Sequence, residues 1–574
     1  MTGKSRAPWL LILLLILPAL LPADGSYLEP FRRMLILENG RQKPLDTFAR
    51  NLLKQFSGRS SLSGQEASAW LARVLFTPGQ TLDDRIFLLN HPDVPAALGI
   101  PGQGRQRFSF MQVRPGWDRL QRLAMQAAQL DEQNRSAVEN EIMRLAANTH
   151  IYITLLNAFN FTSNPGSGGM EPEDPGAPLL AIIPLPDAHM EKWSSPGSIL
   201  ASLGPRPSGV DAEIGLLARA AGAFASGSEW DFSDALSAFN RAVQGRLGHD
   251  RAGKKIFLEI FYNQLDPFFK TEIAYGLALV FLLLSLLVRG KVFPRLSLLF
   301  LLSGLLVHSC GLLARMLIMG RPPVTNLYET FVFVAWAGVL LGILLEWVQK
   351  NSLGIMAGSI AGLLFLLIAG RYSLEGDTMG MLAAVLDSNL WLTTHVVTIS
   401  VGYAGCVMAG IIGHVVLVHR LLYPGNPPLR QRTARSLYAV LAFGLVFTFI
   451  GTVMGGIWAD QSWGRFWGWD PKENGALLII LWCAILFHAR LAGMIGQLGM
   501  AVGAIISIIT VVLAWFGVNL LGVGMHSYGF TSGIAQWLLL FVGGEIIFIT
   551  AALWLIRKRP ALTSARRGRT PEDR

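Results

Sequence analysis

The feature that most constrains this chain is a series of long apolar runs in its second half. Eight runs, with a ninth nearer the end, cover residues 273–288, 296–319, 331–348, 353–370, 392–418, 437–457, 475–494, 497–520 and 534–556. A helical run of about 20 apolar residues matches the hydrocarbon thickness of a bilayer, because each residue adds about 1.5 Å. We therefore predict an all-α fold, a polytopic transmembrane helix bundle of about nine helices after residue 272.

The residues before this bundle have a different character. Residues 24–270 show amphipathic patterns broken by Pro and Gly, which predicts a mainly helical extracytoplasmic domain whose role the residues leave open. Residues 1–23 have a basic start and an apolar middle, as a signal peptide or an N-terminal anchor has. Either one places the following domain outside the cytoplasm. The predicted membrane domain spans residues 271–558, and residues 559–574 form a basic cytoplasmic tail.

The basic residues indicate membrane orientation rather than a nucleic-acid partner. The formal net charge is +10, but Lys and Arg fall largely between the apolar runs and in the tail. If residues 24–270 lie outside, one threading of the chain places these basic loops on the cytoplasmic side, as the positive-inside rule requires. The C-terminus then lies inside, and no nucleic acid is expected as a partner.

The cysteines exclude two functions. Cys310, Cys406 and Cys483 all lie within apolar runs, and the chain has no C-x-x-C or C-x-x-C-H segment. A thiol–disulfide enzyme or a chain with covalently attached haem would need such a segment.

Residues 458–474 are the most informative stretch, and the threading places them as a loop on the outer side. Its aromatic and charged residues are Trp458, Trp463, Arg465, Phe466, Trp467, Trp469, Asp470 and Lys472. Glycines among the rings allow a planar ligand to approach closely, and the two basic side chains could meet its carboxylates. Asp470 and Pro471 with Glu473 predict a fixed turn into the next helix. An ordinary interfacial aromatic belt is the alternative, but a belt has scattered Trp and Tyr.

The segment from Trp463 to Glu473 resembles the WWD signature of the haem-handling proteins CcsA/ResC, CcmC and CcmF. Two further segments favour the CcsA/ResC branch, which belongs to the system II cytochrome c synthases: residues 320–329 are similar to its early outer loop, and residues 525–528 to its second outer histidine segment. The resemblance covers roughly residues 273–556. Residues 40–50, Gly-Arg-Gln-Lys-Pro-Leu-Asp-Thr-Phe-Ala-Arg, resemble only weakly the extra exported segment of longer members.

The histidines acquire roles through this resemblance. His395 and His526 lie at outer helix ends, where a histidine is often bonded only to water or backbone, but they match the outer axial haem ligands of the family. His488 lies thirteen residues past Gly475, ~20 Å from the outer helix end, and matches the inner haem ligand. His308 is a rival inner candidate, or a packing histidine held by a hydrogen bond.

The resemblance implies a role in cytochrome c assembly at a bacterial inner membrane. Haem b would cross the membrane without covalent attachment and be presented on the periplasmic side to the C-x-x-C-H segment of apocytochrome c. The expected partners are a CcsB/ResB-like membrane protein, apocytochrome c and a thiol-reducing, thioredoxin-like protein. The chain would be a component of a haem lyase that forms thioethers, with no acid–base or nucleophilic residue of its own. Alternatives are a CcmC-like haem exporter without ligation activity and a transporter of another amphipathic anion.

Overall fold

The computed structural model describes residues 27–102, 104–131, 134–159, 179–185, 192–201, 208–247, 250–288, 290–374, 376–382, 388–422, 427–521 and 534–558, and all structural statements below concern these residues. They form two compact units. The N-terminal domain comprises the described residues up to Leu265 together with Ser373–Met381. The membrane domain comprises Asp266–Tyr372 and the described residues from Leu382 onward.

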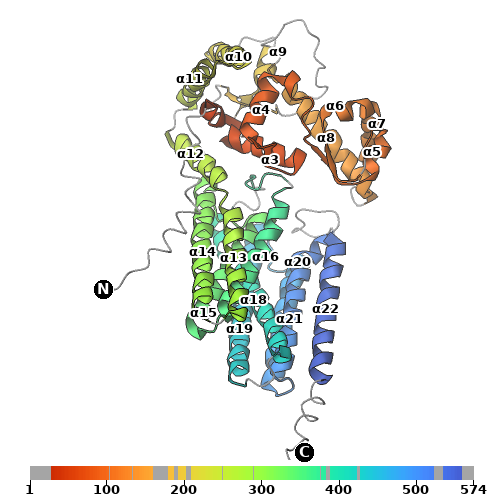
Figure 1. Ribbon diagram of the computed structural model, residues 1–574, viewed down its shortest axis with the longest axis vertical. Coiled ribbons are helices and arrows are strands. Elements are labelled where there is room, and N and C mark those ends of the chain that lie inside the picture. Colours follow the sequence, from red (N-terminus) through yellow and green to blue (C-terminus); the bar gives the residue numbers. More distant parts are fainter. Residues whose placement is uncertain are drawn as a thin grey trace, which may run out of the picture. The chain divides into compact units, whose positions relative to one another are not determined.

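The N-terminal domain is mainly helical, with short antiparallel pairs of strands between its helices (Figure 1). Its helices are α2 (Glu29–Arg32), α3 (Leu45–Ser57), α4 (Ala67–Phe76), η1 (Pro78–Gln80), α5 (Asp93–Leu98), α6 (Phe110–Val113), η2 (Arg114–Gly116), α7 (Trp117–Ala128), α8 (Ala137–Asn157), α9 (Pro196–Ala201), α10 (Val210–Ser226), α11 (Glu229–Leu247) and α12 (Asp250–Leu265). The paired strands are β1 (Leu35–Glu38) with β2 (Arg41–Pro44), β3 (Ser61–Leu62) with β4 (Gln65–Glu66), β5 (Phe87–Leu89) with β6 (Gln106–Phe108), and β7 (Ile183–Pro184) with β8 (Trp193–Ser194).

Aromatic side chains from distant helices fill the core of this domain. Phe76 of α4 stacks on Phe159 at 5.2 Å between ring centroids and meets Phe232 of α11 edge-on at 5.3 Å. Phe56 of α3 meets Trp70 of α4 edge-on at 6.1 Å. Burial of each such ring contributes roughly 1.5–3 kcal/mol, so these aromatic contacts are a main source of the stability of this domain.

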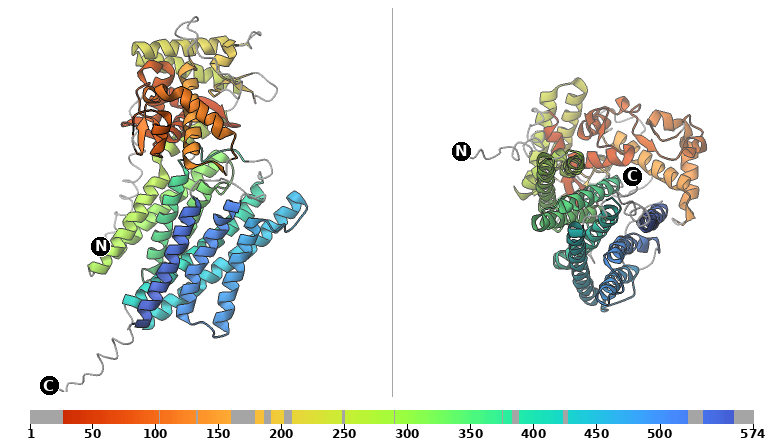
Figure 2. Two further views of the ribbon diagram at one scale, coloured as in Figure 1. Left: turned by 90° about the vertical axis from the view of Figure 1, so that its right-hand side faces the viewer. Right: turned by 60° about the horizontal axis from the view of Figure 1, so that its bottom comes forward.

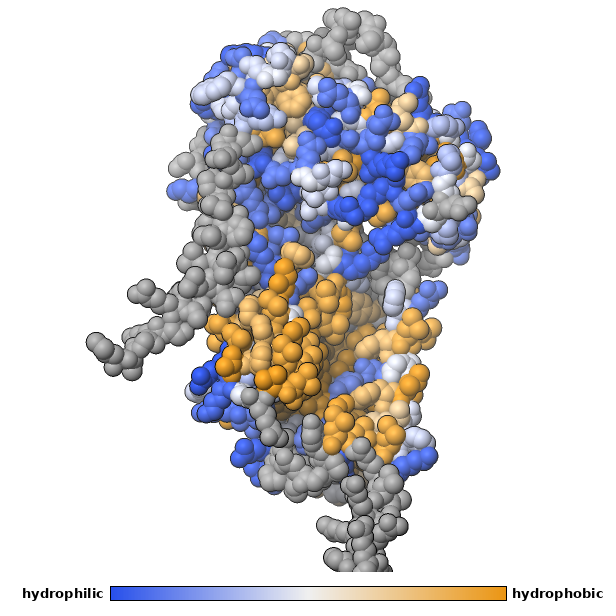
Figure 3. All heavy atoms as spheres, in the orientation of Figure 1, coloured by the Kyte–Doolittle hydropathy of each residue, from blue (hydrophilic) through white to orange (hydrophobic). Residues whose placement is uncertain are grey.

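Nine helices among the described residues are long and apolar enough to cross a membrane, which confirms the predicted polytopic bundle. The helical elements of the membrane domain are α13 (Pro267–Leu287), α14 (Val292–Met319), α15 (Leu327–Gln349), α16 (Leu353–Tyr372), α17 (Asn389–Trp391), η6 (Leu392–Val396), α18 (Val397–Leu422), α19 (Pro427–Trp463), α20 (Pro471–Leu491), α21 (Gln497–Trp515), η7 (Gly517–Leu521) and α22 (Ile534–Lys558). The long helices run side by side in Figures 1 and 2. Apolar side chains gather on their outer surface in Figure 3, and those of α13 include Val280, Leu283 and Leu286.

Small residues let neighbouring membrane helices approach closely. A methyl group added at Gly405 of α18 would lie 2.7 Å from the Cα of Gly444 in α19, and one at Gly342 of α15 would lie 2.6 Å from the carbonyl oxygen of Gly354 in α16. Van der Waals contact between backbones replaces the hydrophobic driving force that is lacking in lipid. These glycines therefore fix the α18–α19 and α15–α16 pairs.

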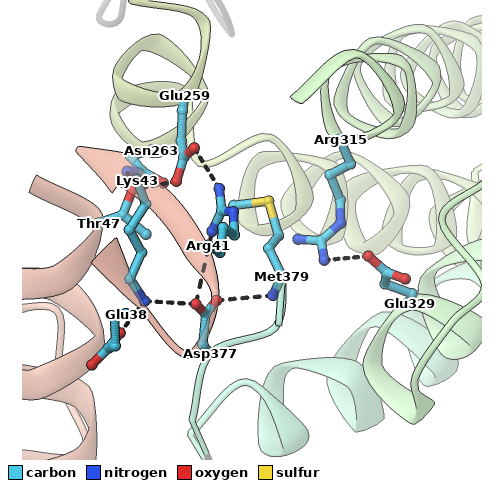
Figure 4. Close-up of polar contacts among 10 residues, drawn as sticks. All are labelled: Glu38, Arg41, Lys43, Thr47, Glu259, Asn263, Arg315, Glu329, Asp377 and Met379. Atoms are coloured by element: carbon cyan, nitrogen blue, oxygen red, sulfur yellow. Dashed lines mark hydrogen bonds and ion pairs between the residues drawn. The ribbon is translucent and has the colours of Figure 1, made fainter. Parts of the chain in front are cut away.

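A buried ion pair joins helices α14 and α15. Arg315 of α14 donates from Nη2 to Oε1 of Glu329 in α15 at 2.7 Å, and both side chains are buried (Figure 4). Oε2 of Glu329 accepts from the backbone and hydroxyl of Thr325, and the carbonyl of the Asn326 side chain caps α15. Paired and hydrogen-bonded charges are the form in which ions are tolerated in an apolar interior.

The chain returns to the N-terminal domain after four membrane helices. Helix α12 ends at Leu265, and the nine residues Ser373–Met381, which follow α16, belong to the N-terminal domain. The predicted membrane domain therefore contains a segment that packs elsewhere. No local pattern marks this segment, because the partner of its Asp377 side chain, Lys43, lies 334 positions earlier in the chain.

Candidate functional site

His395 lies in a π-helical turn at the start of a membrane helix. Ser388 caps the short helix α17, the turn η6 follows, and α18 continues from it. A π-helical turn widens the backbone by one residue and redirects the side chains that it carries, and such turns are frequent at functional sites. The histidine is therefore set apart from the regular packing of α18.

The imidazole of His395 is oriented by the neighbouring helix α19. Nδ1 lies 2.8 Å from the carbonyl oxygen of Gly451, and a carbonyl can only accept. In the neutral ring Nδ1 thus carries the proton and Nε2 the lone pair, which is the arrangement found in metal-binding histidines. Gly455 leaves room for the ring, since a methyl group there would lie 2.6 Å from Cε1 of His395.

Two tryptophans lie beside this imidazole. The ring of Trp458 lies 5.9 Å from that of His395 at an interplanar angle of 63°. Trp391 is nearly parallel to Trp458 with centroids 6.5 Å apart, and its Nε1 donates to Gln461 at 3.0 Å. Trp391 was not among the predicted site residues. Its position four residues before His395, one helical turn away, is the signal that could have found it.

The loop between α19 and α20 is shorter than the predicted loop. Residues 458–474 were expected to form a loop, but α19 continues to Trp463 and α20 begins at Pro471. Trp458 and Trp463 are therefore helical, because α19 continues past its hydrophobic run through the polar residues 460–462. Gly464, in the left-handed region at φ +68°, follows the helix end.

The loop proper, residues 464–470, holds its rings outward. Phe466 packs against Gly456, where a methyl group would lie 2.6 Å from the ring. Trp467 meets Trp469 edge-on at 6.2 Å. Trp469 is 70% exposed and has φ +57°, a conformation that costs roughly 1 kcal/mol or more for a residue with a Cβ. This stretch thus presents an exposed aromatic surface on a constrained backbone.

The turn into α20 is fixed as expected. Asp470 and Glu473 form a reciprocal capping box with Pro471 at the first helical position. Glu473 also accepts from the backbone N–H of Gly468 at 2.8 Å, which holds the loop against the helix. Lys472 points into the protein, because its Nζ donates to the carbonyl of Trp515 at 2.6 Å. Arg465 lies over Gly468, so it is the basic side chain of the loop itself.

His488 and His308, two of the other predicted histidines, have partners other than the residues around His395. His488 is exposed on α20, and its Nδ1 lies 2.8 Å from the carbonyl of Ala484 in the preceding turn. His308 is fully buried, with Nδ1 3.1 Å from the hydroxyl of Tyr275 and its ring edge-on to Phe268. That enclosure corresponds to the packing alternative for His308. His526 lies outside the described residues, as do the predicted leader and tail.

Sequence reasoning missed a polar pair within the membrane domain. Nε2 of His414 in α18 lies 2.9 Å from Oε2 of Glu545 in α22, and its Nδ1 lies 2.9 Å from the carbonyl of Gly410. Within the part of the chain that the structure describes, no three His, Cys, Asp or Glu side chains cluster in a way that could hold a metal ion.

Comparison with known proteins gives concordant matches. The family model described as Cytochrome C assembly protein matches residues 324–526. The chain is 27% identical over 516 residues to Protein NrfI of Wolinella succinogenes, a match covering 85% of this chain and 53% of NrfI. It is 34% identical over 223 residues to the cytochrome c biogenesis protein CcsA of Chlamydomonas reinhardtii, covering 37% of this chain and 62% of that protein. It is 30% identical over 267 residues to CcsA of Solanum tuberosum, covering 40% of this chain and 82% of that protein. The chain thus spans about half the length of NrfI and less than two thirds of the Chlamydomonas protein.

Proposed function

This chain belongs to the CcsA family of cytochrome c biogenesis proteins, and from that premise we propose that it binds haem beside His395 and presents it to apocytochrome c. Membership supports a role in cytochrome c assembly for this multi-pass membrane protein. The proposal goes beyond this role, because it also covers the position of the haem site, the direction of haem transport and the partner proteins.

The observation that carries the proposal is the surroundings of His395. A backbone carbonyl on α19 holds its Nδ1, the adjacent rings are those of Trp458 and Trp391, and glycine replaces a side chain where the imidazole lies. A histidine oriented through its second nitrogen and bordered by flat aromatic rings suits an iron porphyrin better than a free metal ion. The exposed rings of Phe466 and Trp469 extend the apolar surface available to such a ligand.

His526 is the proposed second axial ligand, and Arg465 is the proposed partner of a propionate. Lys472 would have to leave the carbonyl of Trp515 to take that role, so Arg465 is the stronger candidate. Asp470 acts by capping α20 and shaping the loop.

We assign the His395 end of the bundle to the outer side of a bacterial inner membrane. Lys291, Lys350 and Arg490 lie at the opposite helix ends, and basic residues are enriched on the cytoplasmic side. His488, near the cytoplasmic end of α20 and exposed there, is the proposed inner haem ligand. A CcsB/ResB-like membrane protein would supply the ligand opposite it.

The chemistry expected of the chain is positioning. Haem b is the cargo, and each thiol of a C-x-x-C-H segment adds across one of its vinyl groups, forming a carbon–sulfur bond while the thiol hydrogen passes to the other vinyl carbon. A thioredoxin-like protein would keep the two thiols reduced. The contribution of His395 and the tryptophans is to hold the ring plane with the vinyl edge accessible, which lowers the entropic cost of the additions.

The test replaces His395 by Ala in the full chain co-expressed with its partner. The mutant should lose most of the bound haem in the visible spectrum and most of the holocytochrome produced from a reporter apocytochrome, and added imidazole should restore part of both. Haem content and holocytochrome yield equal to wild type would refute the site. Loss of haem export in a host whose own ligation system completes the cytochrome would instead favour the exporter function.

A further inference from the structure

The segment Ser373–Met381 follows the membrane helix α16 but belongs to the N-terminal domain. Residues 373–388 connect α16 to α17, a connection of sixteen residues that leads directly to the π-helical turn of His395. Here the first nine residues are part of the N-terminal domain.

Asp377 is the residue by which this segment is held. Its Oδ2 lies 2.8 Å from Nζ of Lys43 and 3.7 Å from Nη1 of Arg41, both on strand β2 (Figure 4). Its Oδ1 accepts from the backbone N–H of Met379 at 2.9 Å, which folds the segment back on itself. Lys43 is buried, with 1% of its side chain exposed, and it also pairs with Glu38.

A second layer of polar contacts fixes the strand that carries these cations. Nη2 of Arg41 donates to Glu259 of α12 at 2.5 Å, and both side chains are nearly buried. The other oxygen of Glu259 accepts from the hydroxyl of Thr47 at 2.7 Å. Asn263 of α12 donates to Thr47 and to Asp46 at 2.9 and 3.0 Å. Strand β2, the start of α3 and α12 are thereby locked together around the site of Asp377.

Four residues of this network come from the segment 40–50, which resembles the exported segment of longer family members only weakly. Its Arg41, Lys43, Asp46 and Thr47 are buried and bond to carboxylates and an amide of the same chain. Buried charges of this kind are costly unless every partner is present, so they are weak devices for stability alone. Buried charge pairs are better known for selecting one packing arrangement of the chain over alternative arrangements.

We propose that Lys43 and Asp377 form an ionic latch that anchors the connection between α16 and the His395 turn to the N-terminal domain, which makes both of them positioning residues for the outer haem ligand. Anchoring at Asp377 divides the chain between α16 and α17 into two shorter connections, and a shorter connection has less conformational freedom to lose when the turn is ordered. The inference rests on the proposed function for the role of His395, but the latch itself does not.

The experiment compares Asp377→Asn and Lys43→Met, which break the pair from opposite sides, with Asp234→Asn as the matched control. Asp234 pairs with Arg219 at 3.2 Å on the exposed surface of the same domain, where both side chains are more than half exposed. In the full-length protein, amide hydrogen exchange in residues 373–381 should become about tenfold faster or more in both latch variants and stay unchanged in the control. In this exchange measurement the double variant should add little to either single variant, because each single variant already lacks the pair between Lys43 and Asp377.

The second measurement is the visible spectrum of bound haem in the same preparations. The latch variants should show a several-fold smaller bis-histidine signal, and Asp377→Glu should restore part of it. Unchanged exchange in residues 373–381 would overturn the latch, and faster exchange with a wild-type spectrum would overturn the positioning role. A wild-type spectrum in His395→Ala would refute the proposed haem site, while the exchange data would still decide on the latch.

Discussion

His395 depends on a glycine of another helix. Gly455 of α19 occupies the place where any side chain would contact the imidazole, and Gly451, one turn earlier, supplies the carbonyl that orients it. The two glycines are four residues apart and so lie on one face of α19. An apolar helix thereby presents a slot and an acceptor to a histidine that precedes it by more than fifty residues.

Replacing Gly455 by Ala tests this arrangement. The added methyl group would lie 2.6 Å from Cε1 of His395, so the ring must turn away from Trp458 or α19 must shift, at a cost of about 1–3 kcal/mol. We expect at least a several-fold loss of outer-site haem in the visible spectrum. Gly543→Ala on α22 is the control, since its methyl group would meet nothing within 4 Å and haem binding should be unaffected. Equal haem content in the two variants would contradict the slot.

Helix α22 is the element least enclosed by the rest of the bundle. Only 11% of its most apolar 18-residue stretch is buried, compared with 67% of the corresponding stretch of α21. Its packing is supplemented by the pair between Glu545 and His414 of α18, and by contact of the His414 ring with Phe548 at 4.7 Å. A carboxylate in an apolar span is tolerated when bonded in this way, so the pair helps to tie α22 to the bundle.

Replacing Glu545 by Ala should therefore loosen α22. The variant leaves His414 without its partner and should lower the free energy of unfolding by about 1–3 kcal/mol, measured by thermal or denaturant unfolding in detergent. In a double-mutant cycle with His414→Ala, the two effects should not add. Thr550→Ala is the matched control on the same helix, because its hydroxyl bonds only to carbonyls of its own helix. A loss no larger than that of the control would show that the pair does not hold α22.

On the scale of the whole molecule, the two domains are linked at three places in the chain. The chain leaves the N-terminal domain after Leu265, returns at Ser373 and leaves again after Met381. The returning segment is held by Asp377. Burial disfavours the charge of this carboxylate, but the ammonium of Lys43 and the N–H of Met379 outweigh that effect and hold the pKa of Asp377 below its ordinary value of 3.8.

This shift predicts how the latch depends on pH. A carboxylate whose pKa is lowered by folding stabilises the folded state above its unfolded pKa, and that contribution is lost as the pH falls through the folded value. The difference in unfolding free energy between wild type and Asp377→Asn should thus stay constant from pH 7 to about 5 and shrink below about 4. Denaturant unfolding of the N-terminal domain in the full chain, followed at several pH values, measures it. A difference that grows on acidification would contradict the assigned charge pair.

Much of the architecture was determined locally by the sequence. The nine apolar runs specify membrane helices because the length and hydropathy of consecutive residues decide whether a segment can cross a bilayer, and all nine predicted runs are helical. The turn at Asp470 was equally predictable, because a capping box involves residues only three positions apart.

Only the tertiary structure decided which residues from distant parts of the chain are in contact. Neither the stacking of Trp391 on Trp458 nor the bond from His395 to Gly451 leaves a trace in local pattern, since each joins residues of different helices. The pair of Lys43 and Asp377, 334 residues apart, assigns a loop among membrane helices to the N-terminal domain. Local hydropathy and capping are properties of neighbouring residues, whereas these contacts depend on how helices pack and where the chain re-enters a domain, which only the folded molecule specifies.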